Sequence, residues 1–451
     1  MLMRFLSAFI KAKRDPETTE TSRSYAEKVK IFSQEYLKCC LYISQFKPSS
    51  AMFTKYFYSA MTSSSHLLED FLDSHGAKSN KNWYLYRELS AAVRHLSSAG
   101  YFQKHILTRM EFYDLPEDRK FREEGEKTIS FLNSSLTRIS RVVIDEANRL
   151  AIPLPENLYK SDDFPDIATG DTLPSDIHDG LKQEEKKNIV KIATDFLDIN
   201  AYFEEFGLFE PFDMKKIRKL VPEKVNEVEI RTYEMRVHNL QSYFDTYVVQ
   251  GGTTARNTKF RQFRGLFSVV LHLLQVMGRL LHFYERHLHD AGYKDIYKKV
   301  KTQLSFMVKT DTLLDRTINY ALYYVCYFLN KGKDLAHELL NESIERKEVT
   351  VGIPKDRGFH CRPSLLVAKI VNHYGGEVAL VIGPDRFDAS SVLDMQWAGG
   401  KIQQEKITEV VFEGDNRSLR DIELLASVNY AEDRMGKGIP LPKELQYLLN
   451  K

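Results

Sequence analysis

Apolar residues between positions 1 and 345 recur every three to four positions, the spacing of an amphipathic helix. In Ser24–Phe46, for example, Val29, Phe32 and Tyr36 follow this spacing until Pro48 interrupts it. The pattern predicts helices over 24–46, 52–72, 83–110, 117–150, 181–206, 225–249, 260–288, 293–330 and 335–346. We therefore expect an all-helical region over residues 1–346. No fixed-period repeat is present, although solenoid-like stacking of helix pairs stays open.

A polar, proline-rich stretch interrupts the helical series at residues 152–175. It contains Pro153, Pro155, Pro165 and Pro174 among many aspartates and serines, a composition typical of loops. We interpret it as a long loop or as a boundary within the helical region.

The pattern changes at residue 347, where Val349, Val351 and Ile353 alternate with polar residues as in a half-buried strand. Further strands are expected at 378–382, 386–388 and 406–412. Helices are expected at 361–374, 390–397 and 418–434, the second ending at Gly399-Gly400 and the third capped by Asp415 or Asn416. The prediction is an α+β domain over 347–435, with a four-stranded antiparallel sheet and three helices.

Residues 436–451 form a C-terminal extension, with Pro440 and Pro442 before a helical turn at Leu445–Leu449. One interpretation is that this extension folds back onto the helical region and restricts access to His360.

The stretch Gly358-Phe359-His360-Cys361-Arg362-Pro363-Ser364 joins the first predicted strand to the first helix of this domain. His360 therefore stands at a helix N-terminus, where unpaired N–H groups and a partial positive charge favour anions. Pro363 suits the first helical turn, which needs no N–H there. A neutral imidazole at this place can attack a phosphoryl group, whose oxygens would then face the N–H groups and Arg362.

This stretch resembles the active-site signature of the histidine-containing phosphocarrier (HPr) family of the bacterial sugar phosphotransferase system. Gly358, His360, Arg362, Pro363 and Ser364 match the family pattern. Phe359 replaces an aliphatic residue, and Cys361 replaces a small residue that is usually alanine. The strand and helix order over 347–435 follows the family as well. The resemblance implies an open-faced β-sandwich in which His360 accepts a phosphoryl group from enzyme I and Arg362 holds its oxygens.

The resemblance also implies a partner-docking surface and a regulatory serine. The docking positions of the family fall on Leu365, Val392, Leu393 and Gln396. Gln396 stands where the family has an apolar residue, and Asp394 where it has glycine. The family's regulatory serine falls on Ser391, where a phosphate would add about −1.5 to −2 charges beside this surface. The alternative for Ser391 is a plain helix N-cap.

Two clusters in the helical region have side chains suited to binding. Arg256, Lys259, Arg261 and Arg264, with two phenylalanines between them, fit a phosphate, a nucleotide or an acidic partner helix. The alternative, which we favour, is a solvated helix face. His282, Glu285 and His289 share one helix face, but a metal site of the bundle type needs a second such element, and none is found. We therefore predict no metal site and no cofactor.

Composition narrows the class of protein. The 451 residues carry a net charge of +2, so nothing points to nucleic acid. Cys39, Cys40, Cys326 and Cys361 lie in no metal-binding spacing and favour a reducing, cytoplasmic environment. The sequence predicts no transmembrane segment, since no apolar run reaches the ~18 residues that a span needs.

These observations favour a bacterial cytoplasmic regulator rather than an independent enzyme. In this hypothesis His360 accepts a phosphoryl group from enzyme I or a related donor, and the helical region binds an unidentified protein partner. Two alternatives stay open. One is a docking module that is never phosphorylated, and the other is an enzyme in the helical region that the small domain regulates.

Overall fold

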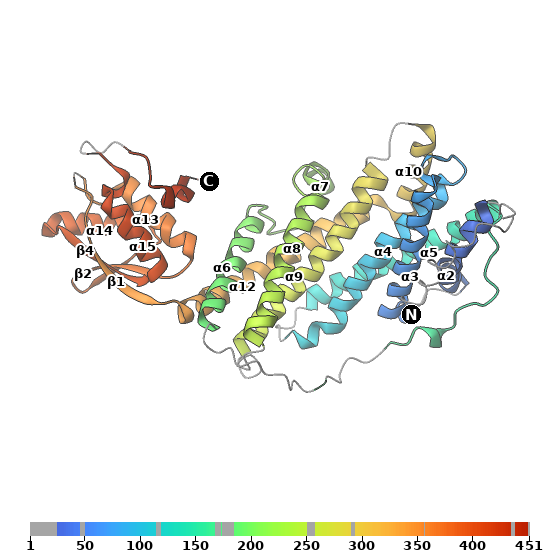
Figure 1. Cartoon of the computed structure of the whole chain (residues 1–451), viewed down its shortest axis with the longest axis horizontal. Coiled ribbons are helices and arrows are strands. Elements are labelled where there is room, and N and C mark those ends of the chain that lie inside the picture. Colours follow the sequence, from blue (N-terminus) through green and yellow to red (C-terminus); the bar gives the residue numbers. More distant parts are fainter. Residues whose placement is uncertain are drawn as a thin grey trace, which may run out of the picture. The chain divides into compact units, whose positions relative to one another are not determined.

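The computed structural model describes residues 25–45, 50–113, 119–166, 173, 185–249, 258–289, 294–355, 357–433 and 438–449 (Figure 1). The chain forms two compact units. The first unit comprises Met1–Lys104, Gly125–Ala168 and Arg279–Leu314. The second unit comprises His105–Glu124, Thr169–Gly278 and Asp315–Lys451.

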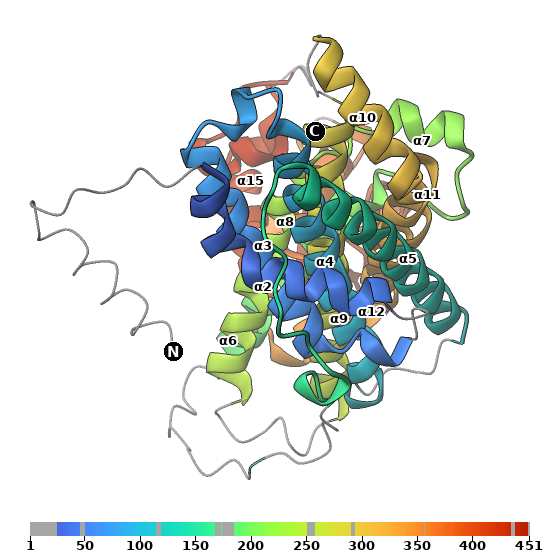
Figure 2. The same cartoon turned by 90° about the vertical axis from the view of Figure 1, so that its right-hand side faces the viewer.

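The first unit is a bundle whose helices are joined by buried polar contacts as well as by apolar packing. Its helices are α2 (Tyr25–Gln45), α3 (Lys55–Ser74), the parts of α4 (Tyr84–Arg109) and α5 (Arg119–Arg149) within its bounds, α10 (Asp295–Val308) and most of α11 (Thr310–Asp315). Tyr86 on α4 donates a hydrogen bond to Ser33 on α2 at 3.2 Å. Tyr58 on α3 donates to Asn133 on α5. Figure 2 shows α2, α4 and α5 from the side of this unit.

The second unit begins with a further set of helices. They are α6 (Glu185–Glu204), α7 (Met214–Leu220), α8 (Glu227–Phe244), α9 (Thr258–Phe283) up to Gly278, and α12 (Tyr323–Ser343). Helix α6 packs along α12. Gly332 makes this close approach possible, because a Cβ atom there would lie 2.5 Å from the ring of Phe196.

Three segments within the described residues have π-helical geometry, in which positions five apart share a face. They are η6 (Asp245–Val249), η8 (Tyr284–His289) and η9 (Arg316–Leu322). Each continues or precedes an α-helix, so the face that the helix presents changes at these points.

The C-terminal part of the second unit is an α+β domain with an antiparallel sheet, as predicted. Its elements are β1 (Arg346–Gly352), α13 (Cys361–Tyr374), β2 (Val378–Ile382), β3 (Asp385–Asp388), α14 (Val392–Glu405), β4 (Glu409–Asp415) and α15 (Asn416–Ser427). The strand order is β1-β4-β2-β3, with every neighbouring pair antiparallel. Phe412 pairs with Val349 on one side and Leu380 on the other, and side chains of all three helices join it in one core. A mostly helical region followed by a small α+β domain is thus confirmed.

Several predicted helix boundaries are wrong. The helix predicted at 418–434 ends at Ser427, before a turn in which Asn429, Tyr430 and Ala431 have positive φ values. The break predicted between the helices at 293–330 and 335–346 is absent, because α12 continues from Tyr323 to Ser343. The helix predicted at 390–397 does not end at Gly399-Gly400 but continues to Glu405, where Lys406 adopts a left-handed conformation. The first of these glycines serves close packing instead. The single helix predicted at 293–330 breaks at Lys309, which has a φ of 56° between α10 and α11. The short helix α7, capped by Asp213, was not predicted.

The C-terminal extension packs on the α+β domain itself, which corrects the interpretation that it folds back onto the helical region. Leu441, Leu445 and Leu448 are buried in the core of that domain. Lys369 on α13 donates a hydrogen bond to the carbonyl of Leu448 at 2.8 Å. The predicted domain boundaries at 346 and 435 stay predictions.

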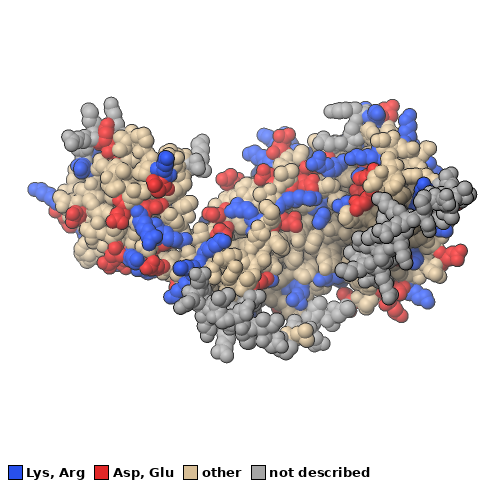
Figure 3. Space-filling model, in the orientation of Figure 1, with Lys and Arg blue, Asp and Glu red and all other residues tan. Residues whose placement is uncertain are grey.

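Among the described residues, one helix is long and apolar enough to cross a membrane, over Thr258–His289. Its most apolar window is 78% buried in the structure, as in the core helix of a folded domain. Figure 3 shows Lys and Arg side chains interspersed with Asp and Glu over the face in view, in keeping with the small net charge.

Candidate functional site

The chain reaches His360 through a turn anchored in the core. Gly358 has a φ of 59°, a left-handed conformation that glycine adopts without strain. Phe359 is buried, with its ring 5.2 Å from that of Tyr430 and 6.2 Å from that of Phe412. The aromatic residue that departs from the family pattern is therefore a core anchor, and it fixes where the next residue starts the helix.

His360 is the N-cap of α13, and its side chain does not cap the helix. The ring is therefore not occupied with the amides of the helix. The Nε2 atom lies 3.1 Å from each carboxylate oxygen of Glu432, and the geometry to Oε2 is that of a hydrogen bond. A carboxylate can only accept, so Nε2 carries the proton, and in the neutral imidazole Nδ1 carries the lone pair. Within the described residues, no group hydrogen-bonds to Nδ1.

Glu432 was not predicted as a site residue. Its side chain is 4% exposed, and it follows a turn in which Asn429, Tyr430 and Ala431 have φ values of 49°, 55° and 57°. Left-handed conformations are costly for such residues and persist only when their surroundings hold them. The Tyr430 hydroxyl donates to the carbonyl of Gly352 at 2.8 Å, and Asn429 accepts from the amide of Lys355 at 3.1 Å. The strained backbone of this turn therefore places the carboxylate of Glu432 beside His360.

Arg362 lies on the same carboxylate. Its Nη1 atom is 3.5 Å from Oε1 of Glu432, and this oxygen accepts no hydrogen bond from the described residues. Gly438 of the C-terminal extension lies close to the guanidinium of Arg362. A Cβ atom at position 438 would be 3.3 Å from Nη1. One buried carboxylate thus holds both residues that the sequence predicted for phosphoryl chemistry.

Fewer backbone amides of the helix N-terminus are available to an anion than the sequence predicted. The amide of Ser364 donates to the carbonyl of His360 at 3.1 Å, and Pro363 has no N–H group. Of the stretch from Cys361 to Ser364, only the first two residues therefore remain to offer amides to an anion.

The predicted docking residues lie on α13 and α14 beside this turn. Leu365 and Leu393 are exposed, while Val392 and Gln396 are partly buried. The side-chain amide of Gln396 lies 3.0 Å from the sulfur of Cys361 and so links the two helices. The site therefore brings together the docking positions that the resemblance implies.

Trp397 adds to this surface and was missed. It is 70% exposed and follows Leu393 by one helical turn, a spacing that places both on one face. The signal that could have found it was the spacing of two large apolar residues on the helix predicted at 390–397.

Gly399 explains how α14 comes so close to His360. A Cβ atom at this position would lie 2.7 Å from the carbonyl oxygen of Phe359, whereas Gly400 has open space around it. The first glycine permits helix α14 to pack directly against the turn that carries the histidine.

Ser391 is the N-cap of α14. Its hydroxyl accepts a hydrogen bond from the amide of Asp394 at 3.2 Å and donates to the Asp394 carboxylate at 3.3 Å. The plain N-cap is therefore present, and the regulatory role stays a prediction.

The predicted anion cluster of the helical region is only partly within the described residues, since Arg256 lies outside them. Lys259 pairs with Glu338 and Glu342, and Arg264 pairs with Asp245. Phe260 and Phe263 are buried, and Arg261 is exposed. An incoming anion would have to displace these carboxylates, so the arrangement favours the solvated helix face.

Comparisons with family models, with curated proteins and with solved structures find no match for this chain.

Proposed function

We propose that this protein is a bacterial regulator whose C-terminal domain, like the HPr family, accepts a phosphoryl group on Nδ1 of His360. The observation that carries the proposal is the hydrogen bond from Nε2 to the buried Glu432, which leaves the lone pair on Nδ1. In this function the domain is a phosphoryl acceptor and not an independent catalyst. Its four-stranded antiparallel sheet then belongs to an HPr-like open-faced β-sandwich.

The transfer uses groups that already surround His360. Nδ1 attacks the phosphorus of the donor, and an N–P bond forms as the bond to the leaving group breaks. The ring becomes positively charged, because Nε2 keeps its proton, and the carboxylate of Glu432 balances this charge from the opposite edge of the ring. The transferred oxygens face the first residues of α13 and Arg362, which must turn from Glu432 toward them.

The exposed Leu365, Leu393 and Trp397 would form the surface on which the donor docks, with enzyme I of the phosphotransferase system as the donor that the resemblance implies. The helical region would bind the partner that responds to the phosphorylation state. A direct hydrogen bond between the α+β domain and the helical region supports this coupling. The amide of Glu377, before β2, donates to Asn341 on α12 at 2.9 Å.

A docking module without phosphorylation is the second candidate. It is favoured by the link between Gln396 and Cys361 and by the ion pair that engages Arg362 with Glu432. Both contacts stiffen the surface around His360 in its unmodified state.

The test is phosphoryl transfer to the full chain, followed by intact mass at mildly alkaline pH, where phosphohistidine survives. One sample receives enzyme I and phosphoenolpyruvate, and a second receives phosphoramidate, a small donor that needs no docking surface. We expect a gain of one phosphoryl group that His360→Ala abolishes and that His373→Gln, a change of an exposed histidine on the same helix, retains.

Each result decides a separate point. A gain with phosphoramidate but not with enzyme I supports His360 as a phosphoryl acceptor and contradicts enzyme I as its donor. Equal gains in His360→Ala and in the unsubstituted protein contradict the proposal. No gain from either donor, with the domain folded, contradicts the phosphoryl acceptor and favours the docking module.

A further inference from the structure

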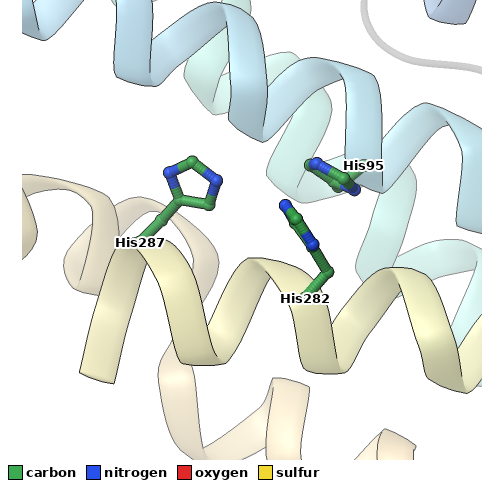
Figure 4. Close-up of side chains that lie close together, drawn as sticks. All are labelled: His95, His282 and His287. Atoms are coloured by element: carbon green, nitrogen blue, oxygen red, sulfur yellow. The ribbon is translucent and has the colours of Figure 1, made fainter. Parts of the chain in front are cut away.

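Three histidines of the first unit come together between two helices. His95 lies on α4, His282 lies near the end of α9 and His287 lies in η8 (Figure 4). One nitrogen from each ring lies within 4.8 Å of the corresponding nitrogens of the other two. Figure 4 shows His95 facing the other two across the space between the helices.

The π-helical turn creates this cluster. Residues five apart point in different directions on an α-helix, where each residue turns by about 100°. In η8 (Tyr284–His289) the wider turn brings His287 onto the face of His282. The sequence suggested His282, Glu285 and His289 because it assumed α-helical spacing. Single π turns inside helices occur frequently at functional sites.

His95 is buried without a partner. It is 1% exposed, and neither ring nitrogen has a hydrogen-bond partner in the part of the chain that the structure describes. Burial, and then the neighbouring His282 and His287 rings, lower the pKa of His95 well below its ordinary value. Buried polar atoms are nearly always bonded, so an imidazole with two unpaired nitrogens needs an explanation. A neutral imidazole offers a lone pair, and this one offers it toward two other imidazoles.

His287 is oriented by a carboxylate. Its Nδ1 atom lies 2.7 Å from Oε2 of Glu88, and both side chains are buried. Arg87 in turn donates to Oε1 of Glu88 at 2.8 Å. A carboxylate that holds one imidazole nitrogen fixes the tautomer and directs the other nitrogen to a metal, as commonly found behind metal-binding histidines.

A pocket of about 640 Å³ opens beside the cluster, within the same unit. His282 and His287 line it, together with Glu69, Arg94, Arg286 and Tyr297. The pocket gives an ion and a small ligand a route to the histidines.

We propose that His95, His282 and His287 bind one divalent first-row transition metal ion, with a remaining coordination position toward this pocket. Three imidazoles favour Zn²⁺ and its neighbours over Mg²⁺ or Ca²⁺, which prefer oxygen ligands. Zinc–nitrogen bonds are about 2.0–2.1 Å long, so the three nitrogens must draw closer than in the structure. The rings of His95 and His282 stack with centroids 4.0 Å apart, and one of them must rotate to direct its lone pair. This metal site is independent of the proposed function of His360, and it departs from the prediction that the chain has no metal site.

The test is Zn²⁺ binding to the full chain after removal of metals with a chelator. Equilibrium dialysis and metal analysis give the stoichiometry and affinity, and a Co²⁺ absorption spectrum reports the ligand geometry. We expect one saturable ion per chain, a higher Tm with Zn²⁺, and an affinity at least about tenfold lower in His282→Gln and in His287→Gln.

A second histidine pair supplies the matched control. His105 and His272 lie on the same two helices, with ring centroids 4.3 Å apart and the His272 Nδ1 atom 2.8 Å from Gln275. His272→Gln should therefore bind Zn²⁺ as the unsubstituted chain does. Circular dichroism establishes that each variant is folded, and His95→Gln is compared only if it is.

Two results would overturn the proposal. One is the absence of saturable Zn²⁺ binding to the folded, metal-stripped chain. The other is equal affinity in the unsubstituted chain, in His282→Gln and in His287→Gln, which would place the ion elsewhere.

Discussion

His360 in the second unit and His287 in the first unit share one device, a buried carboxylate held against one ring nitrogen. Glu432 holds Nε2 of His360 at 3.1 Å, and Glu88 holds Nδ1 of His287 at 2.7 Å. The nitrogen that remains differs, and so does its environment. The side chain of His360 is 30% exposed, whereas that of His287 is 5% exposed. The same pairing can therefore prepare an imidazole for two kinds of chemistry.

The neighbours of each ring separate the two roles. His360 stands beside Arg362 and a helix N-terminus, which favour an anion at the remaining nitrogen. His287 faces His95 and His282, whose lone pairs favour a cation. The comparison teaches that the chemical role of a histidine depends on two features. One is which ring nitrogen is left available, and the other is whether the surrounding groups favour an anion or a cation beside it.

The largest expected effect follows from Glu432→Gln, which keeps the shape of the side chain but removes its charge. If Glu432 balances the phosphorylated ring, the rate of phosphorylation of His360 should fall by about 10²-fold, the lower end of the effect of positioned proton-holding groups. An intact-mass time course measures the rate. Nitrogen NMR of the imidazole should show a larger share of the Nδ1-protonated tautomer, a change that a purely structural role would not cause.

Glu432→Asp supplies the control, because it restores the charge with a shorter reach and should recover part of the rate. An unchanged rate in Glu432→Gln would break the comparison on the side of His360.

The same substitution on the other side, Glu88→Gln, should weaken Zn²⁺ binding by about 10- to 100-fold, because second-shell partners orient metal-binding histidines. Equilibrium dialysis against Zn²⁺ measures this change. Phosphorylation of His360 should stay at its original rate, just as Glu432→Gln should leave Zn²⁺ affinity unaltered. Unchanged Zn²⁺ affinity in a folded Glu88→Gln protein would contradict the role of Glu88.

The two regions also differ in how far the sequence could predict them. The turn around His360 is contiguous in sequence, and alternating strands and a helix stop flank it. Its place and the succession of strands and helices along the chain therefore follow from local patterns. Glu432 escaped prediction because its carboxylate reaches His360 only through a strained turn at 429–431. Nothing in the local pattern announces three successive left-handed residues.

The histidine cluster depends on distant residues and on an unusual helix. Glu88 and His287 are 199 residues apart, and no periodicity pairs them. The π turn at Tyr284–His289 changes which histidines share a face, so α-helical spacing selected His289 in place of His287. The prediction for helix α14 was too short because it also missed a contact between distant residues. Gly399 permits a close approach to Phe359 and does not mark a helix end.

Gly399→Ala tests the packing that joins α14 to the turn of His360. The added Cβ atom would meet the carbonyl oxygen of Phe359 at 2.7 Å, so we expect a loss of about 1–3 kcal/mol in the free energy of unfolding. Chemical denaturation measures this loss. The displaced helix should also slow phosphorylation by enzyme I more than by phosphoramidate, because α14 carries the docking residues.

Gly400→Ala is the neighbouring control. A Cβ atom there meets nothing within 4 Å, and alanine favours a helix over glycine by about 1 kcal/mol. The variant should be as stable as the unsubstituted protein or more so. An equal change in the free energy of unfolding at both glycines would show that the close approach to Phe359 does not govern position 399.

The smallest expected effect concerns Ser391 and distinguishes a cap from a regulatory site. Ser391→Ala removes the hydroxyl that accepts from the Asp394 amide, which should lower the free energy of unfolding by about 1 kcal/mol. Ser391→Asn should restore the cap, and both variants should be phosphorylated on His360 at the original rate.

Ser391→Asp also caps the helix, but its charge faces the Asp394 carboxylate at the edge of the docking surface. If Ser391→Asp slows transfer from enzyme I while transfer from phosphoramidate is unchanged, the serine can regulate docking through charge. If its rates match those of Ser391→Asn with both donors, the side chain serves as a cap alone.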